Sequence, residues 1–553
     1  MVGIQPHLQT SQLKLEDSIC SVPAMETTTT SLPRLSSTGS AWIEPAIATE
    51  PQWIRCSAIE NLCARVYPTP ALFWPLENDD NATVCYQYMC RSLSRVLVQQ
   101  PHLAGFMRQD ARGAFDIEIK SAPQQGTRFY YADLSRDHTF PTFEEFAQAG
   151  FPFADGNADG LSRLRPDPFP QHEDGSPVIT PQLTHLKGGL ILNISFTHIA
   201  GDLLQLREFC NTWAAETREV ARAALEGRQE VPPPCPWPSE MTDKSRLIPD
   251  IPGPATMEEL RGLSKAVPKY QLVDPTDPVA LEAMQNIVPR AHIPACVSSP
   301  EEELRTTVSS VWLFPMAALK RVQSAAQAAR PDVKLSTMDC LTAFLWARFF
   351  AAKYVSDSDL ERAPARSELV YAGDVRRRMS PPMHPSYMGA CVDLFRVQAS
   401  STTLLGSSSD DIATLGSAIR QSNGEWSEEE YMALLSLSQR TPLSPGFVPR
   451  ASIDLLVTDH TRVASVTTAD WGPGLGACTA YREPYIGRTP PAGELTMLPR
   501  RPNGDIEVMI SGEKITLLGL AKDEEMKKAS KCLFITHDVP EEILKRRMRR
   551  VKL

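Results

Sequence analysis

The clearest hydrophobic pattern in the chain spans residues 188–214 and predicts a strand followed by a helix. Apolar and polar residues alternate over 192–196, which is the period of a half-buried strand. After Gly201, which permits a bend, apolar residues recur at spacings of three and four, as on one face of a helix: Leu203, Leu206, Cys210, Trp213 and Ala214. His198 is therefore expected at the end of a strand, where a rigid element can hold a catalytic side chain.

Similar patterns predict helices and strands over most of the remaining chain. In the first half, residues 84–98 have helical spacing, and 138–180 are expected to form loops around short helical pieces. A strand followed by a turn is expected at 65–74, and strands at 106–108 and 115–119. In the second half, strands are expected at 307–314, 369–374, from 389, 453–457 and 505–510, and helices at 316–329, 340–354 and 523–530.

Prolines divide the chain into two halves. Fourteen of the 47 prolines fall between Pro232 and Pro300, a composition that excludes long helices and central strands. We therefore expect four segments: a mostly disordered leader rich in Ser, Thr and Gln (1–44), a first domain (45–228), a proline-rich crossover linker (229–300) and a second domain (301–553).

Composition narrows the class of protein. A net charge of −10 argues against a general nucleic-acid binder, so the basic residues of 545–552 are expected to form a solvated end. The 12 cysteines include no Cys-x-x-Cys pair, which favours reduced thiols in the cytoplasm and no metal site. No apolar run is long enough to span a membrane, and the N-terminus lacks the apolar core of a secretory signal.

The chemistry is expected to centre on His198. A histidine can take a proton from a hydroxyl or an amine as that group attacks a carbonyl. Asp202, four residues later at the start of the predicted helix, can cap that helix or pair with an arginine and thereby fix the turn. The spacing alone is weak in a chain with ten histidines, but the strand before it and the helix after it favour a functional site.

Five stretches occur in the order found in one enzyme family. They are Pro101 to Gly105, His198 to Asp202, Ser336 to Asp339, Asp374 to Arg378, and Asp470-Trp471-Gly472-Pro473-Gly474. Together they resemble the BAHD-type acyl-CoA transferases, whose signatures are His-x-x-x-Asp and Asp-Phe-Gly-Trp-Gly. The substituted second signature and the long linker are most similar to the fungal branch, which includes trichothecene acetyltransferases. The resemblance covers residues 55–530.

The resemblance implies an α/β fold with mixed sheets: two chloramphenicol-acetyltransferase-like domains with a channel between them. It also implies that His198 is the general base and that Asp202 points away from the substrate and pairs with an arginine. Arg376 matches that arginine best by position, and Arg378 is second. The acceptor would attack the thioester directly, and the sequence shows no activated nucleophile motif that would suggest an acyl-enzyme.

Other residues of these stretches are expected to support the site. Asp470, Gly472 and Gly474 are expected to shape a turn rather than to take part in catalysis. Candidates for contact with coenzyme A are Lys320, Arg321, Lys334, Ser336 and Thr337, although a solvated helix face and a helix cap are the simpler interpretations.

The expected function is therefore acyl-CoA-dependent O-acylation, most readily acetylation of a hydroxyl of a terpenoid, polyketide or alkaloid. Transfer to an amine is an alternative, because the same base would serve, and so is a degenerate member that only binds ligand. A peptide-synthetase condensation domain usually carries two adjacent histidines, whereas Thr197 precedes His198 here. The expected partners are the acceptor and acyl-CoA as co-substrate, without a bound cofactor, and the protein is expected to be a monomer.

Overall fold

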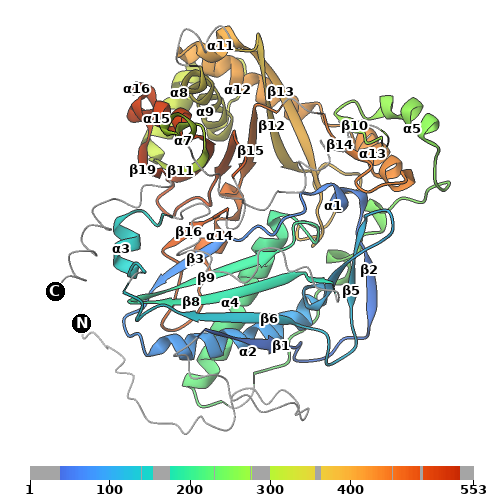
Figure 1. Ribbon diagram of the computed structural model, residues 1–553, viewed down its shortest axis with the longest axis vertical. Helices are drawn as coiled ribbons and strands as arrows, with labels where there is room; N and C mark the ends of the chain where they lie inside the picture. Colours follow the sequence, from blue (N-terminus) through green and yellow to red (C-terminus); the bar gives the residue numbers. More distant parts are fainter. Residues whose placement is uncertain are drawn as a thin grey trace.

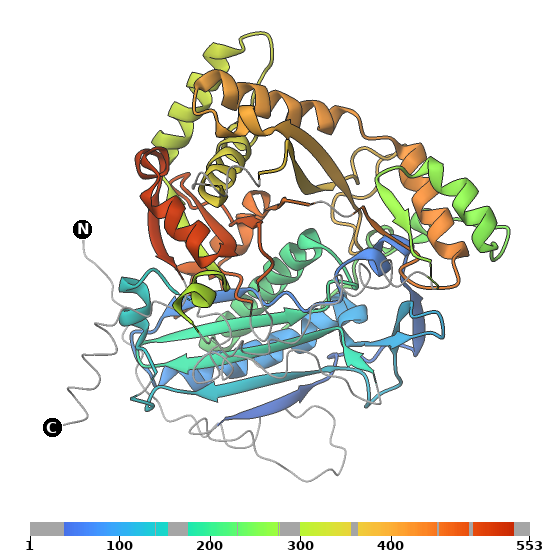
Figure 2. The same ribbon diagram turned by 45° about the horizontal axis from the view of Figure 1, so that its top comes forward.

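Two large mixed sheets lie one above the other in the computed structural model (Figure 1). The structure describes residues 38–138, 140–152, 175–228, 231–274, 276, 299–354, 363–450, 453–485 and 490–535. The turned view separates the layers: the blue and cyan strands of the first sheet lie below, and the yellow to red elements of the second half lie above (Figure 2). The expected mixed α/β architecture is therefore observed.

The first sheet holds the predicted strand before His198. Its six strands lie in the order β1 (Gly39–Ile43), β6 (Thr127–Asp133), β8 (Ile179–Leu186), β9 (Gly189–Phe196), β3 (Ala71–Pro75) and β16 (Ala480–Arg482). β6 and β8 are parallel, and the other neighbours are antiparallel.

Both faces of this sheet are covered. Helices α2 (Asn81–Gln99) and α4 (Leu203–Leu225) contribute to the core with Leu192 and Ile194 of β9. Phenylalanines of and around α3 (Phe143–Gln148) cover Ile191 on the opposite face. All eight residues of β9 are buried, so the prediction of a half-buried strand is corrected. The sequence alternates even though both faces are covered, because Asn193 and Ser195 are polar residues that are buried.

The second sheet carries the helices of the second half. Its order is β13 (Val392–Ser400), β12 (Arg366–Asp374), β15 (Leu455–Asp459), β17 (Glu494–Met497), β18 (Ile506–Glu513), β11 (Thr307–Phe314) and β19 (Lys531–Ile535). Helices near this sheet in the chain are α7 (Pro300–Leu304), α8 (Met316–Ala329), α9 (Thr337–Lys353), α11 (Ser401–Leu405), α12 (Ser409–Gly424), α15 (Lys514–Lys522) and α16 (Glu524–Ala529). The buried residues of α9 and α12 form one core with this sheet.

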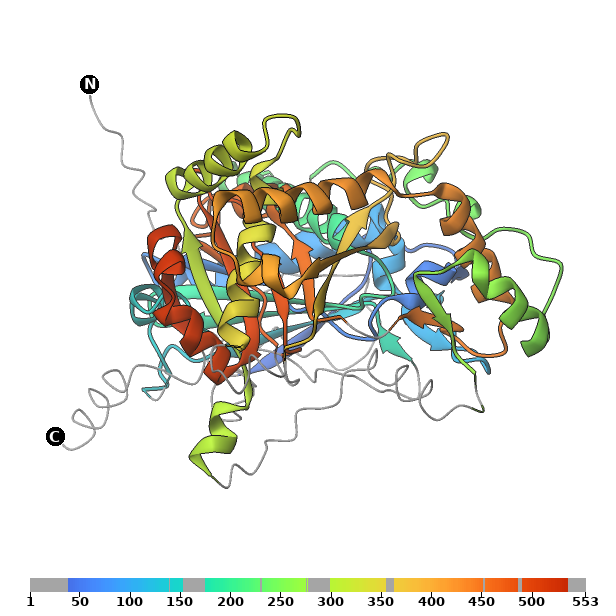
Figure 3. The same cartoon turned by 90° about the horizontal axis from the view of Figure 1, so that it is seen from above.

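Smaller elements surround the junction of the two halves. β2 (Gln52–Arg55), β5 (Phe115–Ile119), β4 (Phe106–Gln109) and β7 (Ser176–Pro177) form a third sheet, and β10 (Tyr270–Leu272) pairs with β14 (Phe447–Pro449). The remaining helices are α1 (Ala58–Leu62), α5 (Met257–Leu263), α13 (Glu428–Arg440) and α14 (Ser465–Thr468). Seen from above, α5 of the linker and α13 lie together at one end of the molecule (Figure 3).

Several sequence expectations are confirmed by element boundaries, and others are corrected. α8 and β11 have the expected limits, and residues 84–98 lie inside α2. Residues 65–74 were expected to form a strand followed by a turn, but the strand is β3 at the end of this stretch, because Pro68 and Pro70 have no N–H to donate to a ladder. β13 begins at Val392 rather than at 389.

Two corrections concern the limits of the halves. β1 lies inside the stretch expected to be a disordered leader, where it pairs with β6; residues 1–37 lie outside the described residues, as do 536–553 with the basic end. β16 comes from the second half of the chain but pairs with β3 in the first sheet. The expected boundary at residue 301 therefore does not separate the two sheets completely.

Candidate active site

The turn after β9 holds His198 between two neighbouring segments. The backbone N–H of Thr197 donates to the carbonyl of Val178 at 2.9 Å, and the N–H of His198 donates to that of Val66 at 2.9 Å. Thr197 and Ile199 are buried, whereas His198 is only partly buried. Hydrogen bonds thus fix the backbone of the turn, while the side chain of His198 stays partly exposed to solvent.

The imidazole of His198 has a defined tautomer. Its Nδ1 lies 3.2 Å from the carbonyl oxygen of Gly201. A carbonyl can only accept a hydrogen bond, so Nδ1 carries the proton, and in the neutral imidazole Nε2 then keeps its lone pair. Nε2 is therefore the atom that can accept a proton from a substrate.

Asp202 closes the turn from the other side. One carboxylate oxygen accepts the N–H of Leu204 at 3.0 Å, which caps α4, and the other accepts the N–H of Cys391 at 3.1 Å. The same carboxylate binds Arg376 through two N–H···O bonds of 2.8 and 3.1 Å. This bidentate arrangement fixes both side chains in orientation as well as in distance.

Arg376 is buried completely and joins the two halves at this point. Besides Asp202, its guanidinium donates to Asp374 at 3.0 Å and to the carbonyls of Tyr387 and Gly389 at 2.9 and 2.6 Å. Burial acts to lower the pKa of Arg376, but the Asp202 carboxylate outweighs it and the pKa is raised, so the guanidinium stays charged.

The second candidate for this pairing, Arg378, lies elsewhere. Its guanidinium donates to the side chain of Asn423 at 3.0 Å and lies over the ring of Phe395. Of the two arginines, the structure therefore brings Arg376 to Asp202.

The second signature forms a tight turn that packs on the first half. Asp470 accepts the N–H of Gly472 at 2.9 Å, and Trp471 packs edge-on against Trp74 and Trp213. Trp471 is 1% exposed, so the motif acts as an anchor for this segment. Asp470 itself is half exposed and lies 3.6 Å from Arg218 of α4.

The glycines of this turn allow a controlled test of stability. Gly472 has a φ of +95°, and a Cβ there would lie 2.8 Å from the Cα of Arg218. We expect Gly472→Ala to lower the free energy of unfolding, by about 1 to 3 kcal/mol from backbone strain alone and further from this overlap. Urea unfolding of the purified variant measures the loss.

Gly474→Ala is the matched control, because Gly474 has a φ of +87° but no atom within 4 Å of its Cβ position. Its free energy of unfolding should fall only by the contribution of backbone strain. Equal losses for the two variants would show that the approach to Arg218 costs nothing.

The structure does not bring the coenzyme A candidates to the His198 turn. Lys320 and Lys334 are exposed, and Arg321 donates to the carbonyl of Lys528 at 3.1 Å. Ser336 and Asp339 form a capping box at the start of α9. α8 and α9 pack on each other and on α12, whereas α4 packs on α2 and α14.

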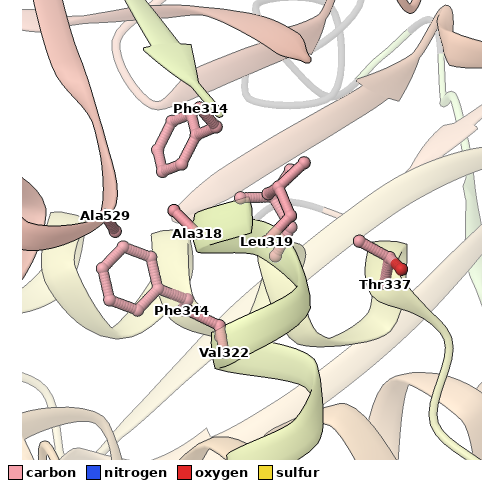
Figure 4. A pocket seen from close by; sticks show the side chains of 8 residues that line it. Phe314, Ala318, Leu319, Val322, Thr337, Phe344 and Ala529 are labelled. Atoms are coloured by element: carbon pink, nitrogen blue, oxygen red, sulfur yellow. The ribbon is translucent and has the colours of Figure 1, made fainter. Parts of the chain in front are cut away.

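Thr337 donates to Gln323 at 2.8 Å and lines a small hollow between α8 and α9. Figure 4 shows that the side chains around it are apolar, among them Phe314, Phe344 and Leu319. A hollow without a charged group does not suit coenzyme A phosphates, so a packing gap is the better interpretation.

Two buried residues behind the turn carry no signal in the sequence patterns. Gln205, in the first turn of α4, and His102, in the 3-10 helix Pro101–Ala104, lie within hydrogen-bond distance of each other. Gln205 is 0% exposed and His102 is 6% exposed. A polar residue at the start of a helix ordinarily faces solvent, which is why neither residue could be singled out from the sequence.

The described part of the chain shows neither a metal cluster nor a membrane-spanning helix. There, no three His, Cys, Asp or Glu side chains are grouped so that they could hold a metal ion. Within the same residues, no helix combines the length and the apolar character that a membrane crossing requires.

Comparisons with known proteins identify the family and the fold. Residues 34–527 match the Transferase family. Acyltransferase clz6 of Cochliobolus lunatus is 25% identical over 502 residues, covering 85% of this chain and 94% of the relative. Eremophilane O-acetyltransferase prx11 of Penicillium rubens is 23% identical over 384 residues, covering 66% of this chain and 75% of the relative.

A solved structure has the same fold. TRI101 of F. graminearum, complexed with ethyl coenzyme A, superposes with a TM-score of 0.65 at 17% identity, covering 88% of this chain and all of that chain. The expected fold and the expected enzyme class, a transferase of acyl groups, are confirmed. Because the match spans most of its length, the chain belongs to the Transferase family.

Proposed function

We propose that the chain is an acyl-CoA-dependent O-acyltransferase in which His198 is the general base. The observation that carries the proposal is the hydrogen bond from Nδ1 of His198 to the carbonyl of Gly201, since it leaves Nε2 free to accept a proton. Asp202 supports this by holding the turn through α4, Cys391 and Arg376.

The reaction would proceed by direct attack. Nε2 of His198 takes the proton of the acceptor hydroxyl as its oxygen attacks the thioester carbonyl, and a tetrahedral intermediate forms. The intermediate collapses, the carbon–sulfur bond breaks, and the leaving thiolate of coenzyme A takes the proton back from the imidazolium. The net reaction exchanges an acyl group between sulfur and oxygen and consumes no other reagent.

Relatives support the choice of substrates. TRI101 is solved with ethyl coenzyme A, and prx11 is named an eremophilane O-acetyltransferase, so acetyl-CoA and a hydroxyl of a secondary metabolite are the proposed pair. The acceptor is proposed to meet acyl-CoA at His198 in a channel between the two domains.

Mass spectrometry after incubation with acetyl-CoA and a panel of terpenoid and polyketide alcohols tests this directly. A product heavier by one acetyl group on oxygen is the expected result. Acetylation confined to amines of a parallel panel would replace O-acylation by N-acylation, and release of no product from either panel or from longer acyl-CoAs would contradict the proposal.

Direct attack also predicts sequential kinetics. Cys391, the cysteine beside Asp202, is not set up as a nucleophile, because burial raises its pKa to about 12. We expect initial-rate plots to intersect when acetyl-CoA and the acceptor are varied together. Parallel lines together with an acetyl adduct on the intact protein would contradict direct attack.

A further inference from the structure

A buried pair of side chains lies directly behind the turn that carries His198. Gln205 occupies the third position of α4, and its amide packs against Gly201, where a Cβ would overlap it. The amide has two carbonyl neighbours, those of Ala200 and Met388, and one imidazole neighbour, His102. These contacts link the turn, the second half of the chain and the 3-10 helix that contains His102.

Only one orientation of the amide satisfies all three neighbours. Carbonyls can only accept, so the amide nitrogen faces Ala200, at 2.7 Å, and Met388. The amide oxygen then accepts from Nε2–H of His102 at 2.6 Å. Burial, followed by the nearby charge of Lys244, lowers the pKa of His102 to about 3, so its ring stays neutral.

This arrangement bears on the tautomer of His198. Ala200 and Gly201 present consecutive carbonyls in the turn: the first is held by Gln205, and the second accepts from Nδ1 of His198. The segment after Arg376 is held in the same way, because Arg376 binds the carbonyls of Tyr387 and Gly389 while Gln205 binds that of Met388 between them. Rotation of the Ala200–Gly201 peptide would disturb the acceptor of His198.

We propose that Gln205, oriented by His102, is a positioning residue that fixes the Gly201 carbonyl and thereby holds His198 ready to accept a proton. The inference rests on the proposed function, since it assigns these two residues to the support of the proposed base. Neither residue needs to touch a substrate. Loss of the pair lets the imidazole turn away from the attack geometry, and small misplacements of a catalytic group are costly.

The test compares Gln205→Met and His102→Leu with a control on the same helix. Thr217→Val removes a buried hydrogen bond of 2.8 Å to Ser92, also between α4 and another element, but 12 residues or about 18 Å further along α4. Each variant is assayed as full-length protein with acetyl-CoA and the alcohol that the wild type acetylates best. Melting temperature, kcat and the KM for acetyl-CoA are measured.

We expect Gln205→Met and His102→Leu to lower kcat by about 10- to 100-fold with KM changed less than twofold. The double variant should be no slower than the slower single variant, since the two side chains act as one unit. Thr217→Val should lose a comparable amount of thermal stability but keep its kcat. His102→Gln, which restores an N–H donor, should recover part of the lost turnover.

A kcat for Gln205→Met and His102→Leu equal to that of Thr217→Val would overturn the inference. If Gln205→Met does not fold, His102→Leu alone decides between the two results. His198→Ala, assayed beside them, separates the proposed base from the proposed positioning role. If His198→Ala is inactive while Gln205→Met and His102→Leu keep the kcat of Thr217→Val, only the positioning role is wrong. If His198→Ala remains fast, the proposed base is wrong, and the positioning role is overturned with it.

Discussion

His198→Ala is expected to fold normally and to lose turnover on the order of 10² to 10⁴-fold, the range expected for removal of a general base. Folding should survive because the turn is held by the backbone bonds of Thr197 and His198 and by Asp202, not by the imidazole. Measured kcat with acetyl-CoA and the preferred alcohol, together with the melting temperature, checks both parts of the expectation.

His138→Ala is a suitable control for this experiment, because His138 is exposed and belongs to the loop after β6. It should leave kcat and melting temperature unchanged. A purified His198→Ala variant with near-normal kcat would show that another group takes the proton.

The second large effect is expected at the pair of Asp202 and Arg376. The arginine is 0% exposed and the aspartate 4%, so removal of either leaves its partner charged and buried. Loss of one member of such a pair costs about 3 to 5 kcal/mol of stability. Asp202→Asn and Arg376→Ala should each lower both melting temperature and kcat/KM, since the pair joins the His198 turn to the segment after β12.

A double-mutant cycle tests the coupling. The two losses should be smaller together than their sum, because the second substitution removes a charge that the first has already left unpaired. Arg378→Ala serves as the control, since its partner is Asn423 near the surface. Strictly additive losses, with Arg376→Ala mainly raising the KM for acetyl-CoA, would instead make Arg376 a coenzyme A contact and Asp202 only a helix cap.

Sequence patterns predicted the elements whose hydrophobic period is long and regular. α4, α8 and β11 fall in this class, since each has a face that repeats over several turns or several residue pairs. β16 could not be predicted, because three residues have no usable period and their partner strand β3 lies about 400 residues earlier. Buried pairing of this kind is decided by tertiary contacts rather than by local preference.

The candidate site shows the same difference between what local patterns predict and what depends on contacts between distant positions. His198 and Asp202 were predicted from local spacing, and the pairing of Asp202 with Arg376 only from the family resemblance, because no local rule joins positions 202 and 376. His102 and Gln205 escaped both approaches, since their hydrogen bond spans 103 positions and neither residue belongs to a recognisable pair. For Lys320 and Lys334 the coenzyme A contact stays a prediction, because a positive charge marks an exposed surface as readily as a phosphate site.

The pairing of β16 with β3 has a consequence for synthesis on the ribosome. β3 borders β9 on one side, and its other edge is covered only after residue 482 has emerged. Once β9 has emerged and paired with β3, typical rates of synthesis keep that edge open for roughly 15 to 60 s, during which other extended segments can pair with it. Folding of the first sheet is thus completed only late in translation, and chaperone protection of the β3 edge would matter most during this interval.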